Sequence, residues 1–118
     1  MSTLRVNTLQ NTSGVEVYTC KAWVNFNGTG TVAIRAAGNV SSITDGGTGD
    51  YTVNFTNSMP DSSYSAVMAF GNDSGSTGNG MFANRLVTQA NNTLRFNCGR
   101  PDNGALADAL LTSVAIFR

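Results

Sequence analysis

Apolar and polar residues alternate along several short stretches of this chain. Residues 20, 22, 24 and 26 are apolar, and the same period of two recurs over residues 51–55, 64–70 and 94–98. That period is typical of a β-strand with one face against a core. Turns rich in glycine and asparagine separate these stretches at intervals of roughly 8–12 residues, which favours a sandwich or a barrel. We therefore predict an all-β fold, an antiparallel β-sandwich (jelly-roll-like or barrel-like) of about eight short strands.

The most distinct hairpin is predicted around Asn27 and Gly28. These residues follow the first alternating stretch and precede a second one over residues 31–37. Asn-Gly is a strong signal for a tight turn because both residues accept positive φ. Trp23 lies opposite the apolar face of the first stretch, so we expect it to cover a second side of the sandwich or to contact another subunit; a sugar-stacking platform is the alternative. The other aromatic residues at alternating positions are expected in the core: Tyr51, Phe55, Tyr64, Phe70, Phe96 and Phe117.

The two ends of the chain differ from its body. Residues 1–19 contain too few apolar side chains to pack by themselves, so we predict an arm that attaches to a partner, followed by a sandwich domain over residues 20–118. The first half of residues 105–118 has some helical propensity, and the second half is predicted as a strand that is apolar on both faces. Such a strand needs cover on both sides. It is either an ordinary central strand or one covered by a neighbouring copy, and we favour the latter. The residues expected at assembly contacts are Leu4, Val6, Leu9, Val114, Ile116 and Phe117.

Two polar stretches, residues 71–80 and 99–104, are predicted as long loops. Loops held by a rigid scaffold often carry binding sites, and Asn, Asp, Ser and Arg side chains offer hydrogen bonds suited to glycans. Ordinary solvated loops are the simpler alternative. The candidate ligand-binding residues are Asn72, Asp73, Ser74, Asn79, Arg100, Asp102 and Asn103.

Composition limits the partners. Charged residues make up 12% of the chain, seven basic and seven acidic, and they form no run of one sign. We therefore expect neither nucleic acid nor an anionic membrane as a partner. No stretch approaches the roughly 20 apolar residues that span a bilayer, and residues 1–5 lack the apolar core of a signal peptide. We expect synthesis in a cytoplasm, with Cys20 and Cys98 as free, buried thiols; a disulfide between them is the alternative.

Catalytic chemistry has little support in the sequence. The chain has no histidine, and its two cysteines lack the spacing of a zinc site. Asp45 and Asp50, or Asp73 and Asp102, could form a carboxylate pair, but aspartates in turns usually bond their own backbone. Asp73 alone is too little acid for a typical calcium loop. The glycine-rich stretches match no phosphate-binding motif. We predict a non-enzymatic protein without metal or cofactor.

A resemblance supplies a more specific context. Lys21-Ala22-Trp23-Val24-Asn25-Phe26-Asn27-Gly28-Thr29-Gly30, then Ile34-Arg35, Asn39-Val40-Ser41-Ser42-Ile43-Thr44-Asp45 and Gly49-Asp50-Tyr51-Thr52-Val53-Asn54-Phe55 resemble a module found in tail-fibre and related virion proteins of tailed phages and prophages. Leu4-Arg5-Val6-Asn7-Thr8-Leu9-Gln10 with Ser13-Gly14 resembles the lead that precedes such modules. The resemblance covers about half of the chain.

The resemblance implies a homotrimer that forms part of a virion and is assembled in the host cytoplasm. The leading hypothesis is a tail-fibre or tail-tip protein. Its arm would bind other virion proteins, and its polar loops would contact a host-surface glycan. The alternative is a trimeric capsid decoration protein that stabilises the shell. A glycan-cleaving enzyme is a third hypothesis, for which the sequence offers no convincing acid pair.

Overall fold

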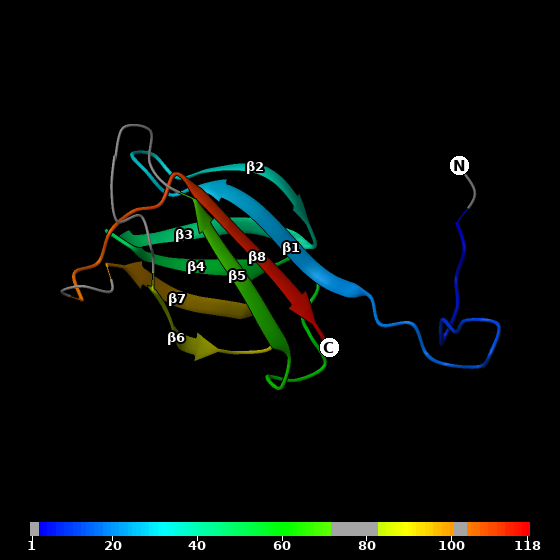
Figure 1. Ribbon diagram of the computed structural model, residues 1–118. Helices are drawn as coiled ribbons and strands as arrows, with labels where there is room; N and C mark the ends of the chain where they lie inside the picture. Colours follow the sequence, from blue (N-terminus) through cyan, green and yellow to red (C-terminus); the bar gives the residue numbers. More distant parts are fainter. Residues whose placement is uncertain (1–2, 72–82, 101–103) are drawn as a thin grey trace.

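Two antiparallel sheets of four strands each face one another (Figure 1). The computed structural model describes residues 3–71, 83–100 and 104–118. One sheet has the order β2-β1-β8-β5 and the other β3-β4-β7-β6. The strands are β1 (Cys20–Asn27), β2 (Ala33–Gly38), β3 (Val40–Gly47), β4 (Asp50–Phe55), β5 (Ser65–Gly71), β6 (Ala83–Gln89), β7 (Thr93–Gly99) and β8 (Leu111–Phe117). This arrangement confirms the predicted all-β sandwich.

The core lies between the sheets and follows the alternation seen in the sequence. Each central strand sends every second side chain inward, and the larger rings contact one another; Phe26 and Tyr51 meet edge to face at a centroid distance of 5.2 Å. The buried apolar residues of these strands are Ala22, Val24, Phe26, Tyr51, Val53, Phe55, Leu94, Phe96, Cys98, Val114 and Ile116. Tyr64 is also buried, and Phe70 is partly buried and packs against the core, as predicted. Phe117 is an exception, because it is 39% exposed on the outer side of its strand.

The inward face of strand β8 is covered by its own chain, and not by the neighbouring copy that we favoured from its sequence. It lies between β1 and β5 as a central strand, and Val114 and Ile116 are buried against the opposite sheet of the same chain. A neighbouring copy is therefore not needed to cover these two side chains. The other face of β8, with Leu111 and Phe117 at its ends, is open. The helical propensity before β8 is not realised, since residues 104–110 are irregular.

The β1–β2 hairpin is present, but its turn differs from the prediction. Residues 28–32 connect the two strands, and within this connection positive φ occurs at Gly30 and not at Gly28. Gly28 is buried instead. Its N–H donates to the Ala109 carbonyl at 2.9 Å, and a Cβ on it would lie 2.5 Å from the Tyr51 hydroxyl. The sequence needs glycine here for space rather than for a tight turn.

Asn39 forms the corner at which the chain passes from one sheet to the other. It separates β2 from β3 and has a φ of 56°, a conformation that asparagine tolerates better than most residues. Its side-chain amide donates to the carbonyls of Lys21 at 3.0 Å and Asn57 at 3.1 Å, and its Oδ1 accepts from the Asn57 N–H at 2.7 Å. One side chain thus joins both sheets along this side of the sandwich.

Residues 3–19 extend from the sandwich at the end where β1 begins and β8 finishes (Figure 1). All of them are exposed. They contain a small hairpin, defined here as the arm hairpin, residues 9–17. Gln10 pairs with Glu16, the Val17 N–H donates to the Leu9 carbonyl at 2.7 Å, and the Asn11 N–H donates to the Val15 carbonyl at 2.8 Å.

Candidate functional site

The sandwich has two chemically distinct ends. The arm leaves at one end, where Cys20 and Ser65 both lie opposite Phe117 in the sheet ladder. At the other end, Gly71 lies opposite Leu111. The two segments predicted to bind a ligand are attached to this second end. Among the candidates, Arg100 is described there, whereas Asn72, Asp73, Ser74, Asn79, Asp102 and Asn103 lie outside the described residues.

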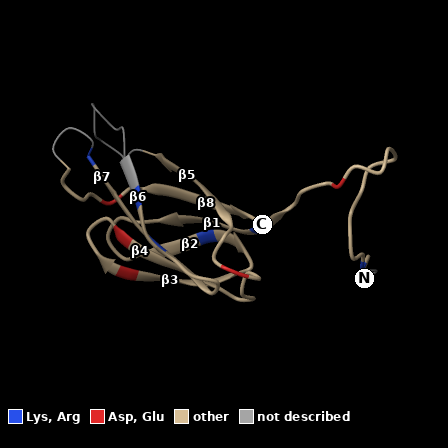
Figure 2. Cartoon of the chain, turned by 90° about the horizontal axis from the view of Figure 1, so that it is seen from below, with Lys and Arg blue, Asp and Glu red and all other residues tan. Residues whose placement is uncertain are grey.

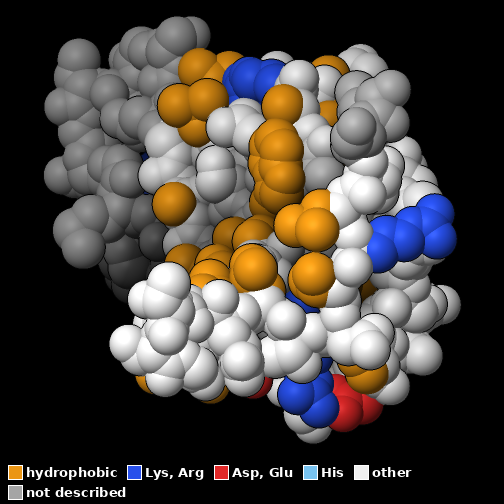
Figure 3. Space-filling view, turned by 90° about the vertical axis from the view of Figure 1, so that its right-hand side faces the viewer, with side chains coloured by type: hydrophobic (Ala, Val, Ile, Leu, Met, Phe, Trp, Pro, Cys, Tyr) orange, Lys and Arg blue, Asp and Glu red, His pale blue; other side chains and the backbone are white. Residues whose placement is uncertain are grey.

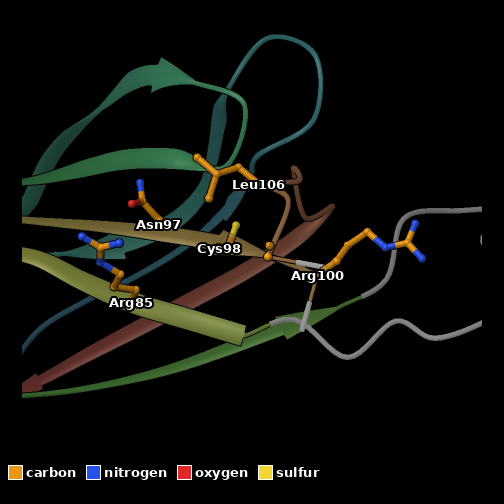
Figure 4. A pocket seen from close by; sticks show the side chains of 7 residues that line it. Arg85, Asn97, Cys98, Arg100 and Leu106 are labelled. Carbon is orange, nitrogen blue, oxygen red and sulfur yellow. The ribbon is translucent and has the colours of Figure 1, made fainter. Parts of the chain in front are cut away.

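A pocket of about 150 Å³ lies at this second end (Figure 4). We call it the far-end pocket. It is lined by Arg85, Asn97, Cys98, Gly99, Arg100, Gly104 and Leu106. Arg85 on β6 and Asn97 on β7 are directly opposite each other in the ladder. The Arg100 side chain points away from these two in Figure 4.

The backbone around the far-end pocket is held by a short pairing that follows β7. The Arg100 N–H donates to the Ala105 carbonyl at 2.8 Å, and the Gly104 N–H donates to the Arg100 carbonyl at 3.0 Å. Gly99 forms a bridge with Leu106, whose side chain thereby reaches the rim of the pocket. A Cβ on Gly99 would collide with the Ala105 carbonyl, so this close approach requires glycine.

The described lining of the far-end pocket is suited to binding an electron-rich group. Arg85 presents a guanidinium group and Asn97 a side-chain amide, and the described lining contains no Asp or Glu. Guanidinium forks donate paired hydrogen bonds to carboxylates, phosphates and vicinal oxygens. Arg100 was predicted as a ligand residue from its loop, but Arg85 was missed because a single arginine on a strand gives no loop signal.

Cys98 offers this pocket no nucleophile. It is fully buried, and its thiol donates to the Ala107 carbonyl at 3.1 Å. Burial, with a smaller contribution from the charge of Asp108, raises the pKa of the thiol to about 11. At neutral pH it is therefore protonated, and the thiolate needed for attack is scarce. Cys20 is also a free thiol, but it is exposed, so its predicted burial is wrong.

The carboxylates weighed for catalysis are engaged separately. Asp50 forms a two-pronged ion pair with Arg95, at 3.0 Å to Nε and 2.8 Å to an Nη, and this hydrogen bonding lowers the pKa of Asp50. Asp45 accepts the Gly47 N–H at 3.0 Å, as aspartates in turns often do. Asp73 and Asp102 lie outside the described residues.

Within the parts of the chain that are described, no three His, Cys, Asp or Glu residues come together as a possible metal site. Those parts also contain no helix long and apolar enough to cross a membrane.

The outer faces of the two sheets differ in polarity. Asn54, on the outer face of the sheet that contains β3 and β4, donates to the hydroxyls of Ser42 at 3.1 Å and Thr44 at 3.0 Å. The outer face of the sheet that contains β1, β8 and β5 exposes Trp23 and Val67 instead, at 44% and 59%. Neither β5 nor β8 carries a charged residue, and Figure 2 shows the few charges scattered over other parts of the chain. Trp23 therefore does not pack inside its own sandwich.

The arm also exposes apolar side chains. Of the three predicted assembly residues in the arm, Leu4 is 82% exposed and Val6 and Leu9 are also exposed. Val15, Val17 and Tyr18 are exposed as well. They were not predicted, because the turn signal at residues 11–14 does not show that the chain after it pairs with the residues before it. Seen from the side on which the arm lies, apolar side chains form a band down the middle of the surface, with charged side chains mostly at its margins (Figure 3).

No protein-family model, curated protein or solved structure matches this chain. The geometry of its two ends is therefore the basis for assigning a function.

Proposed function

We propose that this chain is a non-catalytic structural component of a tailed-phage virion, a tail-fibre or tail-tip protein. Its arm would attach it to other virion proteins, and its opposite end would contact a host-surface glycan. The observation that carries this proposal is that the two ends of the molecule differ: an arm with exposed apolar side chains leaves one end of a rigid sandwich, and the far-end pocket, lined by Arg85 and Asn97, lies at the other. A fibre needs this division, since attachment and display must not compete for one surface.

The arm supports the attachment half of the proposal. Residues 3–19 are exposed throughout, and a two-stranded hairpin of this size is at most marginally stable in water by itself. A partner surface that buries Leu4, Val6 and the apolar side chains of the arm hairpin would offset the entropy lost on ordering them. Copies of this chain arranged as a trimer and neighbouring virion proteins are the partners we propose.

The far-end pocket supports the recognition half. Its arginine and asparagine donors suit the hydroxyl and carboxylate oxygens of a surface glycan, and Leu106 gives an apolar wall for a sugar face. Its small volume of about 150 Å³ fits part of one sugar unit rather than a long chain. We propose that the segments following Gly71 and Arg100 complete the contact.

Protein composition of whole particles tests the virion assignment. We expect the chain in purified particles from the source strain, in a few to tens of copies, and antibodies against it to label the tail. Hundreds of copies on the shell would support a capsid decoration protein instead. Complete absence from particles would refute both hypotheses.

Competition for adsorption tests the recognition half. Purified protein should slow adsorption of the phage to its host cells. Arg85→Ala should weaken that competition because it removes the charged donor of the pocket, whereas Lys21→Ala, a loss of the same charge near the arm, should not. Equal competition by both variants and the unmodified protein would place host recognition elsewhere or in another protein.

A further inference from the structure

The outer face of the β2-β1-β8-β5 sheet carries a shallow trough of about 340 Å³. Its floor is β8, which presents the small side chains of Ser113 and Ala115, and its walls are Trp23 on β1 and Val67 with Ala69 on β5. Trp23, Ala115 and Val67 lie in one row across the three strands. We call this surface the β8 trough. The trough arises because β8 carries the small side chain of Ala115 between the larger side chains of Trp23 on β1 and Val67 on β5.

The indole ring of Trp23 forms one fixed wall of this trough. On its side away from the trough it lies against Gly38 of β2, where any Cβ would collide with the ring. The lining includes no charged residue, and its polar side chains, Asn25 and Ser113, bond to each other at 3.4 Å. Sugars need several free hydrogen-bonding groups beside an aromatic platform, so this lining favours an apolar protein segment over a glycan.

The same chain supplies a segment of that kind. In the arm hairpin, Leu9 faces Val17 and Asn11 faces Val15, while Gln10 and Glu16 form the pair between them. Residues directly opposite in an antiparallel pair lie on one face, and successive pairs alternate between faces. The hairpin is therefore amphipathic. Leu9, Val15 and Val17 lie on one face together with Asn11, whose Oδ1 accepts the N–H groups of Ser13 and Val15, and Gln10 and Glu16 lie on the other face. All three apolar side chains are exposed in the single chain.

We infer that the β8 trough is the docking site for the arm hairpin of a second copy of this chain. The apolar face of the hairpin packs against Trp23, Ala115 and Val67, and Glu16 on its other face stays in water. The two surfaces are complementary because both are apolar and uncharged at the contact, and each is uncovered in the single chain. Burying them together removes the exposed apolar area of both.

The connection to β1 favours a second copy over the hairpin's own chain. Only Tyr18 and Thr19 separate the arm hairpin from β1. To cover its own trough, the chain would have to reverse direction within these residues, and an aromatic and a β-branched residue favour extended backbone rather than a turn. Each copy can instead donate its hairpin to the next, a head-to-tail contact that closes into a ring. The inference rests on the proposed function only in treating the arm as an assembly segment.

Trp23 reports directly on this docking, because it is the only tryptophan in the chain. We expect the full chain to have a solution mass that is a multiple of 12.3 kDa, three times that value for the proposed trimer. Dilution should shift the Trp23 emission to longer wavelength, in step with the loss of mass, as the ring becomes exposed to water. A single-chain mass with emission independent of concentration would overturn the inference.

Charge placed at either side of the contact should dissociate the assembly. Leu9→Asp and Val67→Asp should each raise the half-dissociation concentration roughly tenfold or more. The matched controls are Gln10→Asp, on the polar face of the hairpin, and Thr88→Asp, on the outward side of β6 in the other sheet; neither should do so. Leu9→Lys combined with Val67→Asp should restore assembly above the level of either single change.

Three outcomes separate the inference from its competitors. If Val67→Asp dissociates the assembly and Leu9→Asp does not, the troughs contact each other directly and the hairpin is not the occupant. If the chain is monomeric and added monosaccharides quench Trp23, the surface is a sugar platform. If docking is confirmed but the chain is absent from particles, the proposed virion role fails while this contact stands.

Discussion

The hydroxyl of Tyr51 lies 2.6 Å from Oδ1 of Asp108 and ties together three segments at the far end of the sandwich. The same carboxylate oxygen accepts the N–H of Gly49 at 2.8 Å, and the hydroxyl also lies 2.8 Å from the Gly28 carbonyl. The β1–β2 connection, the β3–β4 turn and the segment before β8 thus meet at one side-chain pair. That last segment contributes Gly104 and Leu106 to the far-end pocket, so the pair supports the pocket from within.

Tyr51→Phe should destabilise the sandwich by about 1–3 kcal/mol, because it leaves acceptors that were bonded in the interior without their donor. Burial first, and then the bond to Asp108, raises the pKa of Tyr51, so the hydroxyl is a donor at every ordinary pH. Urea unfolding of the two proteins measures the difference. Tyr18→Phe is the control: this tyrosine lies on the exposed arm and should change stability by less than about 0.5 kcal/mol. Equal losses would mean that the Tyr51 bond is not stabilising.

Asn39→Ala should be more harmful than Asn39→Gly. Both substitutions remove the bonds to Lys21 and Asn57, but alanine must also adopt the positive φ of 56°, which costs about 1 kcal/mol more than it does for glycine. Thermal unfolding of both variants should therefore give the order wild type, Gly, Ala from most to least stable. A glycine variant less stable than the alanine variant would show that backbone conformation is not the limiting feature of this corner.

The strands could be predicted from the sequence because burial on one face leaves a period of two, as in β1, β4 and β7. The same rule failed for Phe117. Both faces of β8 carry apolar residues, so the pattern does not show which face points inward. The opposite sheet determines that Thr112, Val114 and Ile116 are the residues that point inward. Asn27-Gly28 predicted the hairpin correctly, but Gly28 is needed for space beside Tyr51 rather than for a tight turn. The pattern could not show this contact, because Tyr51 is remote from Gly28 in sequence.

The candidate site was predictable only in part, for a related reason. Arg100 lies in a polar stretch that the sequence predicts as a loop. Arg85, in contrast, is brought to the pocket by the pairing of β6 with β7, which the sequence pattern does not show. The β8 trough depends on the relative sizes of side chains on three strands that are far apart in the chain. Where only one face of a strand is apolar, the sequence pattern shows which side faces outward, but it does not show which strands become neighbours.

The two cysteines should differ sharply in reactivity. Cys20 is exposed, so a thiol reagent should modify one thiol per native chain within the time of mixing. Cys98 is buried with its pKa raised to about 11, and it should react only as fast as the sandwich opens. Adding denaturant should release the second thiol, and Cys20→Ser should abolish only the fast phase. Fast modification of both in native protein would contradict the burial of Cys98.

Stability at high pH should depend on Tyr64. Its hydroxyl lies 2.8 Å from the Ala90 carbonyl and 3.0 Å from that of Thr93, so it joins the start of β5 to the β6–β7 turn, and burial raises its pKa from 10.0 to about 12. A folded-state pKa above the unfolded one means that the folded state holds the proton more tightly. The stabilisation is then complete below pH 10 and is lost as the pH rises from 10 to about 12.

Tyr64→Phe isolates this contribution. The variant should be less stable than the wild type at neutral pH, because the bond to the turn is lost, but its stability should fall less steeply above pH 10. Tyr51, whose pKa is also raised, adds a slope of the same sign in both proteins and cancels in the comparison. Urea midpoints across the alkaline range measure both slopes. Parallel slopes would show that Tyr64 ionises as readily in the folded chain as in the unfolded one, and that its burial does not hold the proton.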